Sequence, residues 1–351
     1  MSVADDITEA RAALTMVQAA PFNAEAPPEA LTTEVTPTPL HYVRSNFALP
    51  EHDGVLHVGG AVGTELALTL DDLRGMPALT RAVTLECAGN GRLTQTPLPV
   101  GEPWGNYAVS TARWTGALLH EVLEQAAPSA DSVDVRFEGA DHGPYQQYEE
   151  QRFVRSLDLA HAADPAAEIL VAYEMNGEPL SADHGAPIRL IVPHWYGVAS
   201  VKWLRRIDLI TQDFAGEFQV GHYMYEWPDR PHEPVTAMRV RARITDPAPA
   251  AVIPAGTYTV RGKAWSGTGP VTKVELSFTG AGDWSQARVE VRREPHAWQS
   301  WSYEWTVTTP GRYTLRARAT DAAGNVQPDV PPWNRLGYGN NAVEVRYVDV
   351  R

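Results

Sequence analysis

The sequence predicts an α+β domain followed by an all-β, immunoglobulin-like sandwich. Residues 41–234 mix short helical patterns with β-prone runs, whereas from about residue 235 seven β-like runs alternate with Gly, Pro and Asp turns. The length of 351 residues also exceeds what one hydrophobic core usually serves. We therefore expect an extended N-terminal strap over residues 1–40, the α+β domain over 41–234 and the sandwich over 235–351.

The N-terminal region begins with a helical pattern and then becomes rich in proline. We expect a short helix over Ile7–Ala20, and an extended segment that wraps the surface over Pro21–Pro39. His41–Phe47 is a short aromatic and β-branched run, which predicts a strand or extended segment. This segment would deliver Arg44 and Asn46 to one place in the fold.

Two helices and a strand are expected in the first half of the α+β domain. Thr69–Gly75 has the pattern of a short capped helix, and Trp114–Leu123 that of a longer one with Thr115 as its N-cap. Ser132–Glu138 alternates as a strand does, and we expect Asp141 in the loop that follows it. A loop aspartate is usually a cap or turn residue.

The second half of the α+β domain and the sandwich are predicted to be mostly strands. Ile169–Met175 should be a strand closed by the Asn176-Gly177 turn, and Ile188–Pro193 and Val201–Ile210 further strands. The sandwich lacks a cysteine pair, so it is not an antibody-type domain. Its seven predicted strands are Arg239–Ile244, Thr257–Ala264, Thr272–Thr279, Ala287–Arg292, Ser300–Thr306, Tyr313–Thr320 and Asn341–Val348.

Composition narrows the class of protein. The formal net charge of -14 argues against nucleic-acid binding, which needs clustered Lys and Arg. No apolar run is long enough to span a bilayer, so we expect no membrane anchor. The first residues carry Asp5, Asp6 and Glu9 and lack the basic start of a secretory signal, and the single cysteine permits no internal disulfide. Cytoplasmic localisation is therefore expected.

The stretch Ala82–Arg92 holds the only cysteine of the chain, Cys87. An apolar β-prone run leads into this thiol and Ala-Gly-Asn-Gly follows it, so the sulfur should lie at a strand end where other groups approach the backbone closely. Such a position suits a ligand site. The alternative is an inert buried cysteine, which is the commoner role of a lone thiol.

Four segments together resemble the sulfite oxidase family of molybdopterin-dependent oxidoreductases, which includes the molybdenum domain of assimilatory nitrate reductases. They are Tyr42–Asn46, Thr84–Arg92, Phe137–Asp141 and Leu170–Lys202, and they occur in the family's order. The resemblance implies that residues 41–234 form the molybdenum-cofactor-binding catalytic domain and that 235–351 form a dimerisation domain. It therefore implies a molybdenum cofactor with one molybdopterin dithiolene, and a homodimer.

The resemblance also implies a role for individual residues. Cys87 matches the position of the metal ligand, where a soft thiolate suits molybdenum. The implied catalytic residues are Arg44, Arg92 and Tyr223, with Tyr225 close enough to be the alternative match. The implied cofactor-binding residues are Tyr42, Val43, Arg44, Ser45, Asn46, Asp141, His184, Arg189, Ser200, Val201 and Lys202. Without the resemblance, Arg44 is most simply interpreted as one half of a surface ion pair, and His184 as a structural histidine.

The sequence departs from the family pattern at Ser45-Asn46, where many members have Asn-His, and at two further positions. Ala199 and Ser302 stand where many members have substrate-site arginines, so the predicted anion pocket is less cationic. The function implied is the oxidation of sulfite to sulfate by oxygen-atom transfer. The segment before Arg44 is too short for a haem domain, so electrons would pass to an external acceptor such as a cytochrome. The alternatives are a reductase of nitrate or of an S- or N-oxide on the same scaffold, and a non-catalytic binding relic.

Overall fold

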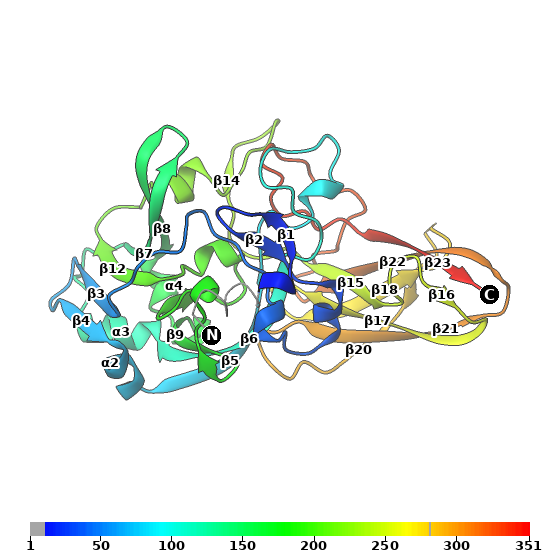
Figure 1. Cartoon of the computed structure of the whole chain (residues 1–351), viewed down its shortest axis with the longest axis horizontal. Helices are drawn as coiled ribbons and strands as arrows, with labels where there is room; N and C mark the ends of the chain where they lie inside the picture. Colours follow the sequence, from blue (N-terminus) through cyan, green and yellow to red (C-terminus); the bar gives the residue numbers. More distant parts are fainter. Residues whose placement is uncertain (1–10, 281) are drawn as a thin grey trace.

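The computed structural model describes residues 11–280 and 282–351 and has two lobes (Figure 1). The lobe that carries the N-terminal two thirds of the chain packs around one large apolar cluster and a second, smaller one. The other lobe has its own core, drawn from Val240 to Val350. Separate cores agree with two domains, while the exact boundary at residues 234 and 235 stays a prediction.

The N-terminal strap lies where the two lobes meet (Figure 1). It contains strands β1 (Thr15–Gln18) and β2 (Asn23–Glu25), which pair antiparallel, and the short helical turns η1 (Pro28–Thr32) and η2 (Thr38–Leu40). The helix predicted over Ile7–Ala20 is therefore wrong for Thr15–Gln18, and its first residues lie outside the described part. Pairing with β2 satisfies the backbone groups that a helix would have satisfied internally.

A mixed sheet and an antiparallel sheet form the first lobe. The order of one is β4 (Leu66–Thr69), β3 (Val55–Gly60), β12 (Leu204–Ile210), β7 (Asp134–Tyr145) and β8 (Tyr148–Asp158). The order of the other is β10 (Glu178–Pro179), β9 (Leu170–Met175), β6 (Val109–Leu118) and β5 (Ala78–Glu86), with β11 (Arg189–Ile191) also paired to β9. Strand β9 ends at the Asn176-Gly177 turn, as predicted.

Helices are short in this lobe. The helix predicted at Thr69 is confirmed: α2 (Leu70–Gly75) has a capping box in which the Thr69 hydroxyl accepts from the N–H of Asp72. The helix predicted over Trp114–Leu123 is wrong in its first half, because Trp114 lies in β6 and α3 begins only at Leu119. Strand β6 pairs with both β5 and β9, and this tertiary pairing overrides the local helical pattern.

The remaining short elements of this lobe connect the sheets. They are α3 (Leu119–Ala126), α4 (Leu159–Ala162), η3 (Arg92–Thr94), η4 (Pro165–Ala167), η5 (Ala182–His184), η6 (Gly197–Ala199), the π-helical turn η7 (Glu217–Gly221), and the strands β13 (Met224–Tyr225) and β14 (Glu233–Pro234). Within the described ranges, no helix is long and apolar enough to cross a membrane.

The second lobe is the predicted β sandwich. One sheet has the order β15 (Arg241–Asp246), β17 (Gly256–Trp265), β21 (Gln299–Val307) and β20 (Arg288–Val289). The other has the order β16 (Val252–Ile253), β23 (Glu344–Val350), β22 (Gly311–Asp321), β18 (Val271–Ser277) and β19 (Ser285–Gln286). Each of the seven predicted runs overlaps one of these strands.

Candidate functional site

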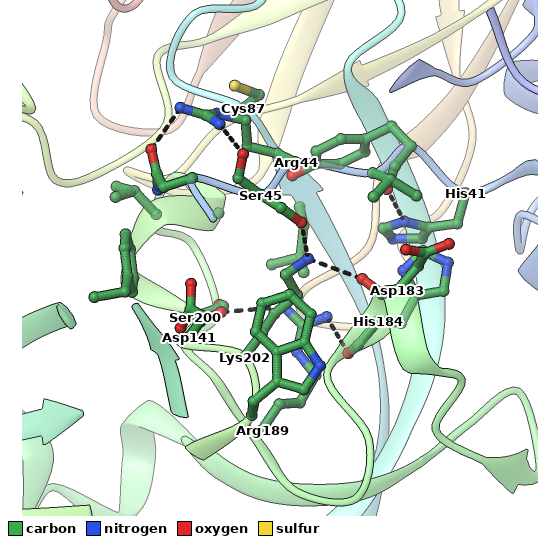
Figure 2. Close-up of a pocket in the computed structure, with 18 of the residues that line it drawn as sticks. His41, Arg44, Ser45, Cys87, Asp141, Asp183, His184, Arg189, Ser200 and Lys202 are labelled. Atoms are coloured by element: carbon green, nitrogen blue, oxygen red, sulfur yellow. Dashed lines mark hydrogen bonds between the residues drawn. The ribbon is translucent and has the colours of Figure 1, made fainter. Parts of the chain in front are cut away.

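A cavity in the first lobe gathers most of the residues singled out from the sequence (Figure 2). About 670 Å³ of space in it is free of protein atoms, counting the part of its mouth that opens to solvent. Its lining includes Tyr42, Val43, Arg44, Ser45, Asn46, Cys87, Asp141, His184, Arg189, Ser200, Lys202 and Tyr223. Two predicted residues are not in the lining. Val201 is buried in the apolar core, and Arg92 is buried with its guanidinium bonded to the carbonyl oxygens of Leu336 and Glu102.

Cys87 lies directly after β5, at the start of the Ala-Gly-Asn-Gly turn. The thiol is free and nearly buried, and its backbone N–H donates to the carbonyl oxygen of Ala108 at 2.9 Å. Burial raises the pKa of the thiol, although the guanidinium groups of Arg44 and Arg92 act in the opposite direction. Figure 2 places Cys87 at one end of the group of labelled side chains and Arg189 at the other.

The end of the cavity away from Cys87 is cationic. The Lys202 ammonium donates to Ser45 Oγ and to the carbonyl oxygen of Asp183, both at 2.8 Å. The Arg189 guanidinium donates to the carbonyl oxygens of His184, at 2.9 Å, and Ser200, at 3.1 Å. Burial lowers the pKa of Arg189 to about 10, and burial together with Arg189 also lowers the pKa of Lys202.

Two histidines stand beside these cations. The rings of His41 and His184 meet edge to face with their centroids 4.9 Å apart. Burial lowers the pKa of both, that of His41 to about 3, so both rings are neutral at physiological pH. The hydrogen-bond partners of Lys202 and Arg189 are carbonyl and hydroxyl oxygens, which carry no full negative charge. The charge of both cations is therefore available to an anionic group such as a phosphate.

Local backbone geometry brings the cationic residues together. His184 ends η5, and Gly185 follows in the left-handed region with φ of 99°. A Cβ on Gly185 would lie 3.0 Å from Cβ of Lys202 and 3.2 Å from Cβ of Arg189. Glycine at this position thus permits both the turn and the close approach of the two cationic side chains.

Asp141 supplies an acceptor without a partner. It lies within β7, not in the predicted loop, at a place where the register between β7 and β8 is irregular. Its side chain is buried, and its Oδ1 atom has no hydrogen-bond partner among the described residues. Burial raises the pKa of this carboxyl against the opposing effect of Lys202. An orphaned carboxylate oxygen in a cavity fits a ligand that donates an N–H there.

Arg44 lies on the Cys87 side of the cavity. Its guanidinium donates to Asn46 Oδ1 at 2.7 Å and to Glu102 Oε1 at 3.1 Å. Burial alone would lower the pKa of Arg44, but the Coulombic effect of neighbouring acidic groups, Tyr223 first and Glu102 next, raises it. Arg44 therefore stays charged close to the thiol.

Tyr223, not Tyr225, faces the cavity. The buried Tyr223 follows η7 with φ of 60°, and its ring stacks on Tyr338 at a centroid distance of 5.1 Å. Tyr225 lies outside the lining and stacks on Trp227. Burial raises the pKa of Tyr223, so its phenol keeps its proton at neutral pH and is able to donate it to a ligand.

Several residues near the site were not singled out from the sequence. A segment of the second lobe, Asn334–Asn341, reaches the site: its Tyr338 stacks on Tyr223, and its Leu336 carbonyl oxygen accepts from Arg92 Nε at 3.0 Å. Ser302, by contrast, lies in β21 opposite Arg261 and Arg288. No local pattern marks Asn334–Asn341, because the contact joins residues 244 positions apart.

Arg155 of β8 is a second residue that the sequence did not indicate. It is completely buried, its guanidinium carbon lies 5.9 Å from the centroid of the Tyr223 ring, and it donates to the carbonyl oxygen of Phe218. Among the described residues no carboxylate lies within ion-pair distance of it. Burial lowers its pKa to about 10. It adds positive charge beside Tyr223.

A buried ion pair fixes the Cys87 turn to the second lobe. Glu86, the last residue of β5, accepts from Arg241 Nη1 at 2.8 Å and from Trp265 Nε1 at 2.9 Å. Asn90 Nδ2 donates to the same carboxylate at 2.8 Å. Glu86 and Arg241 are 2% and 3% exposed. The residue before Cys87 is therefore held by both lobes.

The donor set around the cavity fits a molybdenum–pterin group. Cys87 provides one soft sulfur ligand, Asp141 an unpaired acceptor, and Arg189 and Lys202 the charge for a phosphate. Among the described residues no cluster of three His, Cys, Asp or Glu side chains could hold a metal ion by itself. A metal at Cys87 would therefore need ligands from a cofactor.

Comparison with known proteins identifies similar domains over most of the chain. Residues 46–218 match the family model of the oxidoreductase molybdopterin binding domain, and residues 232–347 match that of the Mo-co oxidoreductase dimerisation domain. Chicken sulfite oxidase is 36% identical over 342 residues, which cover 90% of this chain and 74% of the relative. Human mitochondrial sulfite oxidase is 38% identical over 92% of this chain, and the chain spans 63% of the human protein's length.

Two further proteins are similar over most of the chain. NADH nitrate reductase 1 of Arabidopsis thaliana is 33% identical over 92% of this chain and 39% of the relative. The solved structure of the sulfane dehydrogenase SoxCD from Paracoccus pantotrophus has 26% identity and a TM-score of 0.83, covering 94% of this chain and 85% of that one.

Proposed function

The chain belongs to the sulfite oxidase family of molybdopterin-dependent oxidoreductases, and from this membership we propose that it oxidises sulfite to sulfate. Its cofactor is molybdenum with molybdopterin. The observation that carries the proposal is that the free thiol of Cys87, the charged Arg44 and the protonated Tyr223 line one cavity. In the balanced half-reaction, one sulfite and one water give one sulfate, two protons and two electrons.

The protein groups have distinct roles in this proposal. Cys87 is the one protein ligand of the metal, and the bound cofactor supplies two-electron oxygen-atom transfer. Arg189, Lys202 and His184 would hold the cofactor's phosphate, and the unpaired Oδ1 of Asp141 would accept from the amino group of the pterin ring. Charge-assisted hydrogen bonds of this kind contribute about 1.5–3 kcal/mol each. Together they would retain a cofactor that has no covalent link to the chain.

The substrate is held by cations and a phenol. Arg44 binds the oxyanion through its planar guanidinium, and Tyr223 donates its phenolic proton to a substrate oxygen. Arg92 does not line the cavity, but it holds the backbone near Arg44 in place, because its guanidinium donates to the carbonyl oxygens of Leu336 and Glu102, the latter at 2.6 Å. Arg155 adds positive charge beside the phenol. The electrons leave to an external acceptor such as a cytochrome, and the second family model supports a homodimer.

A reductase of nitrate or of an S- or N-oxide is the second candidate. The nitrate reductase among the relatives favours it, as does Ala199, where many family members have a substrate-site arginine. Turnover of nitrate with a reduced dye, and none of sulfite with an oxidised one, would select this function over sulfite oxidation.

A sulfite-dependent reduction of ferricyanide or cytochrome c tests the first proposal. Molybdenum-loaded protein should reduce either acceptor when sulfite is added, and Cys87→Ser should not, because a hydroxyl is a poor ligand for this metal. Molybdenum and pterin content are measured on both proteins at the same time. Wild-type protein that holds both and is inactive with sulfite would overturn the proposal, whereas protein that binds neither would support a non-catalytic relic.

A further inference from the structure

The Glu102 carboxylate lies between the two arginines that the resemblance assigns to the substrate anion. Glu102 Oε1 accepts from Arg44 Nη2 at 3.1 Å, and Glu102 Oε2 lies 3.8 Å from Arg92 Nη1. The Glu102 side chain is 32% exposed, while those of Arg44 and Arg92 are 17% and 3% exposed. An acidic side chain that reaches in from solvent thus bridges two nearly buried cations.

The backbone holds Glu102 at this place. Its carbonyl oxygen accepts from Arg92 Nη1 at 2.6 Å and from the N–H of Trp104 at 2.8 Å. Trp104 is buried in the core of the first lobe, which anchors the end of the loop. Gly101 precedes Glu102 with φ of 121°, and a Cβ there would lie 2.9 Å from Cζ of Arg92. The loop is therefore fixed against Arg92 by its main chain, so the carboxylate can leave Arg44 by side-chain rotation alone.

We propose that Glu102 is a resident anion that an oxyanion substrate must displace from Arg44, and that it sets the affinity and selectivity of this site for anions. This inference rests on the proposed function, because it assumes that Arg44 binds the substrate. Arg44 Nη2 has two N–H groups, which donate to Asn46 Oδ1 and Glu102 Oε1, so a sulfite or sulfate oxygen that binds this nitrogen competes with the Glu102 carboxylate.

The arrangement has a consequence for selectivity. With Glu102 in place, the charges of Arg44 and Arg92 are partly neutralised, and monovalent anions that gain little from the site are rejected. A divalent oxyanion that makes several hydrogen bonds can still replace the carboxylate. Glu102 is therefore a positioning residue that acts through Arg44, and its removal should change substrate affinity more than turnover.

The test is the variant Glu102→Gln, which keeps the shape of the side chain and removes its charge. The probe is sulfate, titrated by calorimetry into the oxidised, molybdenum-loaded protein. Since exposed charge pairs contribute about 1 kcal/mol at most, the dissociation constant of sulfate should fall by about fivefold. The KM for sulfite should fall by a similar factor with kcat within about twofold. Glu102→Ala, which also removes the charge, should shift both constants in the same direction.

Glu294→Gln is the matched control. Glu294 pairs with Arg113 at 2.9 Å and its side chain is 30% exposed, but it lies away from the cavity. This variant should leave the sulfate and sulfite constants unchanged. Glu102→Asp, which keeps the charge on a shorter side chain, should bind sulfate more weakly than Glu102→Gln does.

The outcomes separate this inference from the proposed function. If sulfite is oxidised but Glu102→Gln and Glu102→Ala bind sulfate no more tightly than wild type, the inference is wrong and the proposed function stands. If wild type does not oxidise sulfite but both variants bind sulfate more tightly, the proposed function is wrong and the role of Glu102 stands. Tighter binding in the control Glu294→Gln as well would assign the effect to net charge and overturn the inference.

Discussion

Replacing Arg241 by Met should destabilise the protein strongly, because it leaves the Glu86 carboxylate buried without its cation. In the native chain this carboxylate accepts from Arg241, Trp265 and Asn90, and only the last two donors would remain. Breaking a buried ion pair on one side costs about 3–5 kcal/mol. Since whole proteins are stable by about 5–15 kcal/mol, this loss is a large share of the total.

The assay is urea unfolding followed by tryptophan fluorescence on cofactor-free and cofactor-loaded protein. A loss of about 3–5 kcal/mol should lower the unfolding midpoint by about 1–2 M if the slope is about 3 kcal/mol per M. Because Glu86 immediately precedes Cys87, the variant should also retain less molybdenum after gel filtration.

Arg312→Met is the matched control for this prediction. Arg312 pairs with Asp349 at 2.9 Å, but its side chain is 70% exposed, so its loss should leave the unfolding midpoint nearly unchanged. A loss below about 1 kcal/mol in Arg241→Met would contradict the reasoning, because it would mean that the Glu86 carboxylate is solvated or that its other donors suffice.

Two further predictions follow from local geometry and from burial. Gly139→Ala places a Cβ against Oδ1 of Asp141 and 2.9 Å from the Lys202 carbonyl oxygen, so the purified variant should contain clearly less pterin. The control is Gly75→Ala, whose Cβ meets no atom within 4 Å, and it should keep a normal pterin content. Burial lowers the pKa of His194 from 6.5 to about 4. As the pH falls, His194 is therefore protonated in the unfolded chain before it is protonated in the folded one, so the free energy of unfolding should decrease between pH 6.5 and 4. After discounting for solvent screening this fall is about 1–2 kcal/mol, and an unaltered pH slope in His194→Gln would refute it.

Local patterns predicted the parts of the fold that local physics determines. The capping box at Thr69 and the Asn176-Gly177 turn follow from a few neighbouring residues. The run Trp114–Leu123 is compatible with a helix and with a strand. Its first half is a strand because β6 pairs with β5 on one side and with β9 on the other. Thr15–Gln18 is a similar case, since its partner β2 lies beyond a turn.

The candidate site divides in the same way. Cys87 and the segment from His184 to Lys202 were found because each stands in a recognisable stretch of sequence. No local sequence pattern indicates Glu102, Arg155 or Tyr338, because their place in the site depends on contacts with residues far away in the sequence. Only the folded chain brings Tyr338 to Tyr223 and Glu102 to Arg44.

The segment Asn334–Asn341 belongs to the sandwich in the sequence, but in space it contacts residues of the candidate site. An exchange of sandwich lobes between related enzymes would therefore transplant part of the substrate environment along with the oligomerisation module. Hybrids built at the linker near residue 235 should inherit ligand preferences from both parents, so assembly and selectivity in this architecture cannot evolve independently.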